Sequence, residues 1–160
     1  MAKVNVKYII LHWTAGNYVP NYIDMESYDL LLTGDGLKMI GNHELDNSKA
    51  STAGMNSITY NIACCGGLNS TPLKKVQCEA FFKAVAEKLK QFNLTVDKVY
   101  THAEIGEMCK DKTITKLLPY NSYLNNNISK IDLTKLPYDL QGKSSGDFIR
   151  NKVLWYYLNC

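Results

Sequence analysis

Residues 6–12 read Val-Lys-Tyr-Ile-Ile-Leu-His, a run of branched and aromatic residues that favours a buried strand and ends on His12. A second strand-like run, residues 99–102, also ends on a histidine, His102. The carboxyl ends of strands are where α/β proteins usually place their sites. A lone strand-end histidine is most often a hydrogen-bonded structural residue, but two in equivalent places favour a shared role. These runs therefore predict a sheet with a pair of imidazoles at one edge.

A third metal-binding side chain follows at Asp132. Two imidazoles and one carboxylate make a typical catalytic zinc site, because three protein ligands leave a fourth position for water. We therefore expect His12, His102 and Asp132 to bind Zn²⁺. Cys109, which is close to His102 in the sequence, is a reserve ligand.

The remaining pattern of the first half predicts further strands of a mixed sheet. Residues 27–33 and 37–40 flank Gly34-Asp35-Gly36, which predicts a hairpin. Residues 59–65 predict a central strand, because they are rich in apolar residues and end at a pair of glycines. The segment from residue 41 to residue 57 is polar and without period, and we expect an ordered surface loop there.

Helices and one long loop are expected in the second half. Thr71 and Pro72 predict the start of an amphipathic helix, as its N-cap and its first helical residue. Its apolar face recurs at helical spacing and consists of Cys78, Phe81, Phe82, Val85, Leu89 and Phe92. Residues 106–127 predict a long loop, and a final helix is expected from near Ser145.

The composition fits a single globular α/β domain over residues 1–160, with 46% apolar residues and no low-complexity tract. A net charge of +3 is too small and too scattered to indicate nucleic-acid binding. No apolar run predicts membrane insertion, and residues 1–5 lead into a strand without a signal peptide, so we expect synthesis in the cytoplasm. The five cysteines form an odd set without CxxC spacing, which does not predict a disulfide framework.

Four motifs occur in a specific order: residues 9–16 around His12, Tyr28 ahead of the hairpin, residues 101–104 around His102, and residues 130–132. Together they resemble the zinc-dependent N-acetylmuramoyl-L-alanine amidases of type 2, a family that includes phage endolysins and peptidoglycan recognition proteins. The likeness covers most of the chain. It implies a central mixed β-sheet flanked by α-helices, with a zinc groove on one face.

The resemblance implies a role for each matching residue. His12 and His102 match the two histidine ligands, and Asp132 matches a third ligand that is aspartate or cysteine in relatives. Lys130 stands where active relatives often carry a lysine that polarises the scissile carbonyl. Tyr28 matches a tyrosine that assists catalysis beside the metal in some phage members.

The general base is less clearly marked. Glu104, two residues after His102, is a candidate general base or supporting carboxylate, with a structural role as the alternative. Many family members carry a glutamate on the central strand, but the matching residue here is Ala63. Ser51 likewise stands where phage relatives carry a histidine. These departures leave room for water activated without a dedicated glutamate.

The C-terminal motif allows a second alignment with the family. It would place Lys143 in the lysine role and Ser145 or Asp147 in the ligand role. The context of residues 131–137 favours the assignment to Asp132.

Substrate contacts are expected from the loop that follows the first strand. Flat aromatic faces pack well on sugar rings, so Trp13 and Tyr18 are candidates to line a substrate groove together with Asn17. His43 lies in a polar loop and is expected at the rim of the groove.

The function implied by the resemblance is a zinc-dependent amidase that cuts peptidoglycan between N-acetylmuramic acid and the L-alanine of the stem peptide. The alternatives are a recognition module that binds peptidoglycan without cutting it and a structural metal protein. We expect the partner to be the glycan strand with its stem peptide. Such a domain would act at the cell wall or periplasm, either as an endolysin released through a holin or as an exported effector with an immunity protein.

Overall fold

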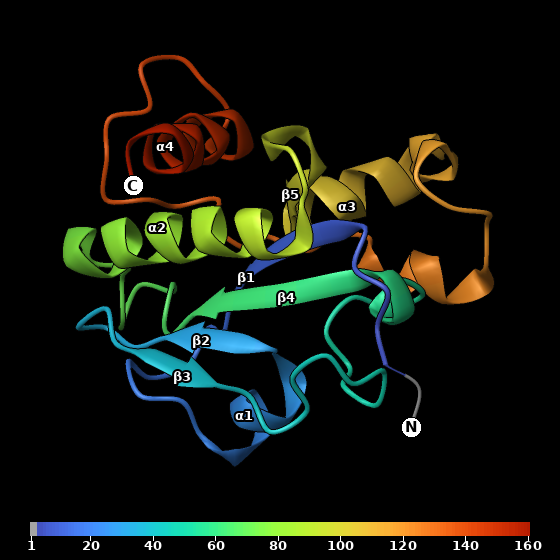
Figure 1. Cartoon of the computed structure of the whole chain (residues 1–160), viewed down its shortest axis with the longest axis horizontal. Helices are drawn as coiled ribbons and strands as arrows, with labels where there is room; N and C mark the ends of the chain where they lie inside the picture. The colour runs from blue at the N-terminus through green and yellow to red at the C-terminus, as the bar shows by residue number, and fades with distance from the viewer. Residues whose placement is uncertain (1–2) are drawn as a thin grey trace.

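The computed structural model describes residues 3–160, and five strands form its central mixed sheet in the order β3-β2-β4-β1-β5 (Figure 1). The strands are β1 (Tyr8–Trp13), β2 (Leu30–Leu32), β3 (Lys38–Ile40), β4 (Thr59–Cys64) and β5 (Val99–Thr101). β2, β4, β1 and β5 run parallel to one another, whereas β3 is antiparallel to β2 and forms a hairpin with it. The expected α/β architecture, hairpin and central strand are therefore confirmed.

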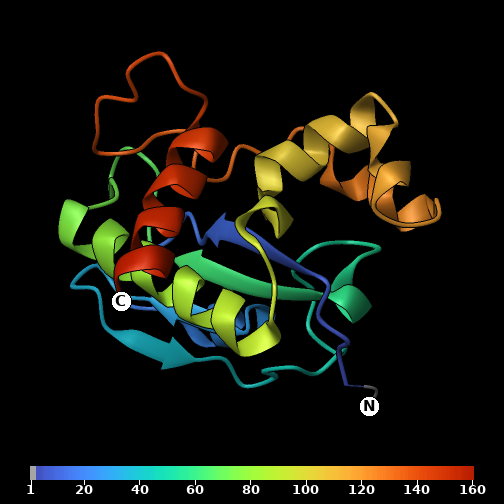
Figure 2. The same cartoon turned by 45° about the horizontal axis from the view of Figure 1, so that its top comes forward.

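The helices are distributed unevenly around this sheet. α2 (Lys75–Phe92) and α4 (Ser145–Asn159) pack against each other over one face of the sheet (Figure 2). α1 (Tyr22–Ser27) lies on the far side of the β2–β3 hairpin from α2 (Figure 1). α3 (His102–Lys110) follows β5 directly and packs on two short 3-10 helices, η3 (Thr113–Lys116) and η4 (Ser122–Asn127). Two further 3-10 turns, η1 (Asn56–Ile58) and η2 (Val96–Lys98), precede β4 and β5.

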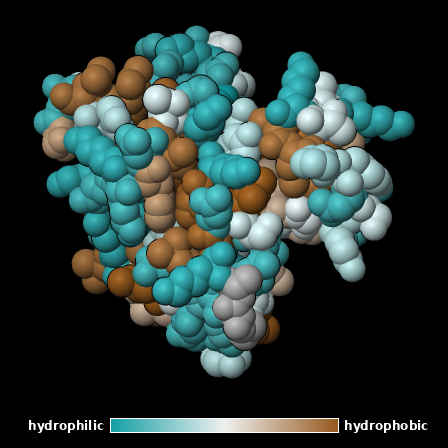
Figure 3. Space-filling model, turned by 45° about the vertical axis from the view of Figure 1, so that its right-hand side comes forward, coloured by the Kyte–Doolittle hydropathy of each residue, from teal (hydrophilic) through white to brown (hydrophobic). Residues whose placement is uncertain are grey.

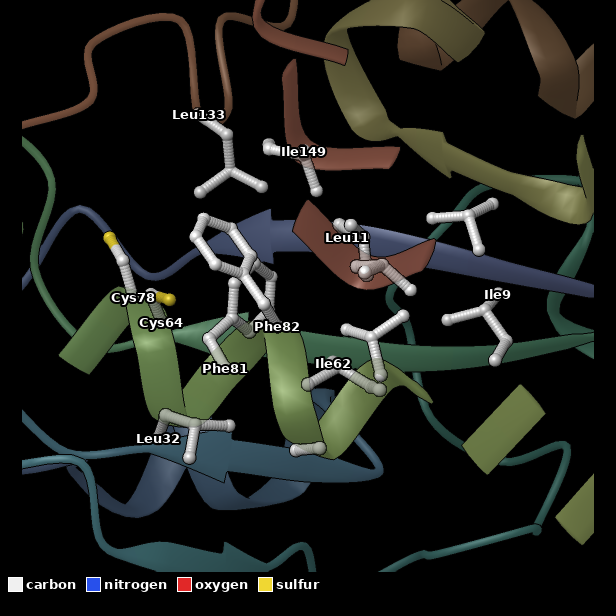
Figure 4. Close-up of a cluster of buried hydrophobic side chains, with 14 of the residues drawn as sticks. Ile9, Leu11, Leu32, Ile62, Cys64, Cys78, Phe81, Phe82, Leu133 and Ile149 are labelled. Atoms are coloured by element: carbon white, nitrogen blue, oxygen red, sulfur yellow. The ribbon is translucent and has the colours of Figure 1, made fainter. Parts of the chain in front are cut away.

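Alternation along β1 separates the main core from the opposite face of the sheet. Ile9 and Leu11 join the core with Phe81 and Phe82 of α2 (Figure 4). Ile10 belongs to a second cluster beneath α3 and η4. Successive side chains of a strand point to opposite faces, so His12 points to the same side as Ile10, away from α2. The main core thus fixes the sheet and leaves the other face for His12.

The expected start of the first long helix is wrong. α2 begins at Lys75 rather than at Pro72, because the Thr71 hydroxyl donates to the Gly16 carbonyl at 2.7 Å instead of capping the helix. The helix start is capped by Gln77, whose side-chain oxygen accepts from the Lys74 N–H at 3.3 Å.

The segment 106–127, expected to be a loop, is largely helical. Thr101 caps α3 by accepting from the Glu104 N–H at 3.1 Å, and the Glu104 carboxylate accepts from the Thr101 N–H at 2.9 Å. This capping box makes His102 the first residue of a helix rather than the last residue of a strand. The predicted final helix from Ser145 is confirmed.

The surface mixes polar and apolar residues. Hydrophilic residues cover much of the face in Figure 3, interrupted by brown hydrophobic patches. Within residues 3–160, none of the helices combines the length and the apolar character that crossing a membrane requires. The five cysteines are free thiols, and Cys160 is the exposed one.

A buried ion pair ties the loop after β3 to the sheet. Asp29 and Lys49 are both fully buried, and the Lys49 Nζ lies 3.3 Å from the Asp29 Oδ1. The Asp29 carboxylate also accepts from the Leu45 N–H at 2.8 Å and from the Asn61 N–H at 2.7 Å. Asp29 therefore holds strand β4 and the loop together at one point.

Replacing Lys49 with Met should lower the free energy of unfolding by about 3–5 kcal/mol, because the Asp29 charge would stay buried without its partner. Urea denaturation measures the change. The exposed pair of Lys38 and Glu87 offers a matched control, since Lys38→Met should change stability by no more than about 1 kcal/mol. Equal effects of the two substitutions would contradict the importance of the buried pair.

Candidate metal centre

The parallel pairing of β1 with β5 brings the two histidines together. Leu11 is paired with Thr101, so His12 and His102 follow at the same edge of the sheet. Their ring centroids lie 4.7 Å apart, with the rings near perpendicular at 70°. Both are almost completely buried. The sequence prediction that the two imidazoles meet is confirmed.

Asp132 completes the cluster from a segment that follows η4. Its Oδ2 lies 3.7 Å from the His12 Nδ1, and its Oδ1 lies 3.6 Å from the His102 Nδ1. One ligand atom from each of the three residues falls within 4.8 Å of the others. The Trp13 backbone N–H donates to the Asp132 Oδ2 at 3.2 Å and fixes the carboxylate.

The donor set fits a metal ion. The buried His12 Nδ1 has no hydrogen-bond partner among the described residues, and such atoms are rare in folded proteins. The distances from Asp132 to the two Nδ1 atoms exceed the usual hydrogen-bond range. Ligand atoms that bind one zinc ion tetrahedrally at ~2.1 Å lie roughly 3.4 Å apart. The spacing therefore suits a shared cation better than direct hydrogen bonds.

Burial sets the charges of the cluster. It lowers the pKa of His102 to about 4, with the neighbouring His12 acting in the same direction. Burial alone would raise the pKa of Asp132, but contacts with His12 and His102 outweigh it and the pKa lies below its ordinary value. At neutral pH the site thus offers a charged carboxylate and, in His102, a neutral imidazole, which are the forms that bind metals.

Tyr28 and Lys130 flank the cluster, as the sequence predicts. The Tyr28 ring centroid lies 5.0 Å from that of His12. Burial and the charge of Asp132 raise the pKa of Tyr28, so its phenol keeps its proton at neutral pH. Lys130 is exposed and lines a cleft of about 570 Å³ beside His102. Both side chains present hydrogen-bond donors near the cluster.

Glu104 is engaged elsewhere. One carboxylate oxygen accepts from the Arg150 Nη1 at 2.8 Å and from the Thr101 N–H, and the other accepts from the Arg150 Nη2 at 2.7 Å. These contacts join α4 to the start of α3, directly beside His102. The geometry favours a structural role over the general-base role.

The residues expected to bind substrate are not gathered in the cleft. The prediction that Trp13 lines a substrate groove is wrong, because Trp13 is only 5% exposed and belongs to the main core. Its ring lies against Gly67, where an added Cβ would come within 2.3 Å. Tyr18 is half-buried and donates to the Pro72 carbonyl at 2.7 Å. Asn17 is exposed.

His43 also lies outside the cleft and outside the metal cluster. It is half-buried, and its Nε2 lies 3.0 Å from the Glu26 Oε1. Neither His43 nor Asn17 lines the cleft beside His102, so their substrate roles stay predictions.

The structure favours Asp132 over the second alignment. Asp147 pairs with Arg150 at 2.8 Å, and Ser145 opens α4. Lys143 lines a different hollow together with residues of α4. Cys109, the reserve ligand, is buried in the second core cluster.

Of the two departures from the family pattern, Ala63 is the one that lies beside the histidine of β1. Ala63 is paired with His12 in the β1–β4 register and brings no carboxylate to the site. The Ser51 hydroxyl donates to the Ser27 carbonyl. The next residue, Thr52, is fully buried and its Oγ1 lies 3.4 Å from the His12 Nε2. Sequence reasoning missed Thr52, as well as Asn61 and Asn127, whose side-chain oxygens lie 2.8 Å from the Nε2 atoms of His12 and His102.

The lowered pKa of His102 predicts that the metal-free protein weakens in acid. The unfolded chain binds the proton near pH 6.5 and the folded chain near pH 4, so the unfolded state holds more protons between these values. The free energy of unfolding should therefore fall by about 1.4 kcal/mol per pH unit from this group as the pH drops from 6.5 to 4. His102→Gln should flatten the curve measured by urea denaturation, and an unchanged slope would contradict the assignment.

Comparisons with known proteins place the chain in a family. A search of curated protein sequences found no significant match. Among solved structures, the N-acetylmuramoyl-L-alanine amidase LysC from Clostridium intestinale is similar at a TM-score of 0.55 and 17% identity, over 71% of this chain and 86% of that one. PlyL is similar at a TM-score of 0.54 and 16% identity, over 79% of this chain and 86% of that one. The Ph2119 endolysin of a Thermus scotoductus bacteriophage is similar at a TM-score of 0.53 and 17% identity, over 65% of this chain and 75% of that one.

These three structures share the fold of the chain. The sequence itself matches a family model over residues 2–114, which include both histidines of the cluster. The chain belongs to the N-acetylmuramoyl-L-alanine amidase family.

Proposed function

We propose that the protein is a zinc-dependent peptidoglycan amidase that hydrolyses the amide bond between N-acetylmuramic acid and the L-alanine of the stem peptide. Membership in the amidase family supports the reaction class. The observation that carries the metal assignment is the buried His12 Nδ1, which lacks a hydrogen-bond partner within residues 3–160 and faces Asp132 beside His102. Two imidazoles and a carboxylate form a typical ligand set of catalytic zinc.

His12, His102 and Asp132 would hold the ion. Bound zinc polarises a carbonyl group and lowers the pKa of bound water toward about 7. The Asp132 carboxylate would offset part of the charge of the ion, and the Trp13 N–H keeps that carboxylate in place. Burial of all three ligands excludes bulk water on the core side, which strengthens electrostatic interactions with the substrate.

Tyr28 and Lys130 would stabilise the negative charge that develops on the amide oxygen. Tyr28 keeps its proton because burial raises its pKa, so its phenol donates a hydrogen bond. Lys130 brings a positive charge to the cleft beside His102. Donors that are already in position before the reaction lower its barrier, because no reorganisation is needed.

The cleft beside His102 is the proposed seat of the stem peptide and sugar. Its lining combines amide side chains, a basic group and an aromatic face, in Asn47, Asn56, Asn126, Lys130 and Tyr123. Tyr123 is 68% exposed and offers a flat apolar surface. Amides and a lysine suit the acetamido and carboxylate groups of peptidoglycan, and the lining residues include no acidic side chain.

Ala63 supports one competing function, a module that binds peptidoglycan without cutting it. No carboxylate stands opposite His12 in β4 to take a proton from water. Cleavage and binding therefore have to be measured separately.

Incubation of the zinc-loaded protein with purified peptidoglycan should release stem peptides with a new L-alanine amino terminus, detected by mass spectrometry. A chelator should abolish the release, and added zinc should restore it. Binding to peptidoglycan without release would favour the recognition module. Neither binding nor release would overturn the proposed function.

Asp132→Asn should reduce bound zinc well below one ion per chain, because the ligand charge is lost. Asp147→Asn is the matched control, since Asp147 pairs with Arg150 outside the cluster. Elemental analysis after dialysis gives the zinc content of both variants. Zinc loss from Asp147→Asn alone would instead support the second C-terminal alignment.

Lys130→Met and Tyr28→Phe should each lower kcat by about 10²–10³-fold while zinc content is unchanged, because each removes one donor to the developing oxyanion. Lys116→Met, an exposed lysine of η3, is the control for the lost charge and should leave kcat unchanged. The rates come from the same peptide-release assay. A wild-type kcat in Lys130→Met would exclude that residue from the reaction.

A further inference from the structure

Each histidine of the cluster contacts the side-chain amide of an asparagine. The His12 Nε2 lies 2.8 Å from the Asn61 Oδ1, and the His102 Nε2 lies 2.8 Å from the Asn127 Oδ1. Asn61 is in β4 and Asn127 is the last residue of η4. Both asparagines are almost completely buried. The two histidines thus make equivalent contacts with asparagines from two separate elements of the chain.

The orientation of Asn127 is fixed by its own amide nitrogen. The Asn127 Nδ2 donates to the Ala53 carbonyl at 2.8 Å and to the Leu124 carbonyl at 3.0 Å. Its Oδ1 must therefore be the atom that faces His102, and an amide oxygen only accepts. In a neutral ring the proton is then on the His102 Nε2, which leaves the Nδ1 lone pair pointing at the Asp132 side.

The same reasoning fixes Asn61. The Thr59 hydroxyl donates to the Met55 carbonyl at 2.9 Å, so it accepts from the Asn61 Nδ2 at 3.1 Å. The Asn61 Oδ1 then accepts from the Thr52 hydroxyl at 2.7 Å and from the His12 Nε2. The proton of His12 is on Nε2, which explains why its buried Nδ1 has no partner in the part of the chain that the structure describes.

Two consecutive residues connect these asparagines. The Thr52 hydroxyl contacts Asn61, and the Ala53 carbonyl contacts Asn127. The backbone here is held by Asn56, whose Oδ1 accepts from the Thr52 N–H at 2.9 Å and from the Ser51 N–H at 3.3 Å. Residues 51–56, which we call the clamp loop, therefore form one hydrogen-bonded unit that reaches both ligands.

We propose that the clamp loop sets the tautomer and direction of both metal-ligating histidines, with Thr52 as its positioning residue. The inference rests on the metal assignment made under the proposed function. It assigns a role to the segment in which Ser51 departs from the family pattern. The loop also borders the cleft through Ser51, Ala53, Gly54 and Asn56, so the unit that orients the ligands lies next to the proposed substrate seat.

Thr52→Val tests the proposal, because it removes the hydroxyl and keeps the shape of the side chain. Zinc affinity, measured by competition with a chromophoric chelator, should fall about 10–100-fold, as losses of ligand-orienting hydrogen bonds do. Thr52→Ser should restore it. Thr115→Val is the matched control, since the Thr115 hydroxyl donates to the Lys112 carbonyl on the surface at 3.1 Å.

A second measurement uses the metal-free protein and does not depend on zinc. Nitrogen-15 NMR of the imidazoles should show both wild-type rings protonated at Nε2, and Thr52→Val should shift the nitrogen signals of His12 and His102 together. A wild type with either ring protonated at Nδ1, or a variant in which His12 alone changes, would overturn the proposal. Unchanged zinc affinity in Thr52→Val would also overturn it, whereas failure of the wild type to bind zinc would overturn the metal assignment instead.

Discussion

The parallel pairing of β1 with β5 is the constraint on which the site depends. It places the carboxyl ends of both strands at one edge, so that His12 and His102 meet although they lie far apart in the sequence. The main core secures this pairing from the other face, where Leu11 lies in one apolar cluster with Phe82 of α2 and Ile149 of α4 (Figure 4). The site therefore depends on the packing of residues that never touch it, because a shift of β1 by one residue would turn His12 into the core.

A buried carboxylate between two imidazoles is costly for a protein to maintain. Asp132 is 8% exposed, and its nearest imidazole nitrogens are too far for strong hydrogen bonds. Buried charge is tolerated when it is paired or coordinates a metal. A proton on His102 does not offset the charge of Asp132 at neutral pH, because burial and the neighbouring His12 ring lower the pKa of His102 to about 4. A metal cation offsets the charge of Asp132 without requiring a protonated ring.

The sequence predicted the parts of the site that local pattern controls. The apolar run before His12 and the hairpin glycines indicated the sheet, and the ligand types indicated the metal. The prediction that Trp13 binds substrate is wrong because adjacent side chains of a strand point to opposite faces of the sheet. His12 faces the site, so Trp13 packs into the main core. The role of Asn61 could have been predicted from the sequence, because a polar residue inside an apolar, buried strand needs a hydrogen-bond partner. The sequence gives no such signal for Asn127 or Thr52, because their roles arise from tertiary contacts. Asn127 contacts Ala53 across 74 positions, and Thr52 contacts Asn61 across 9 positions.

The missing glutamate has consequences for how the proposed reaction is driven. Ala63 opposite His12 offers no proton acceptor, and Glu104 is held by Arg150. Beside the Asp132 carboxylate, the Tyr28 phenol keeps its proton and Lys130 lines the adjacent cleft. Both of these side chains are hydrogen-bond donors. The proposed reaction therefore relies on stabilising charge on the amide oxygen more than on a strong general base, and such stabilisation requires ligands that do not move. A loop that holds both histidines in one tautomer is a physical means of meeting that requirement.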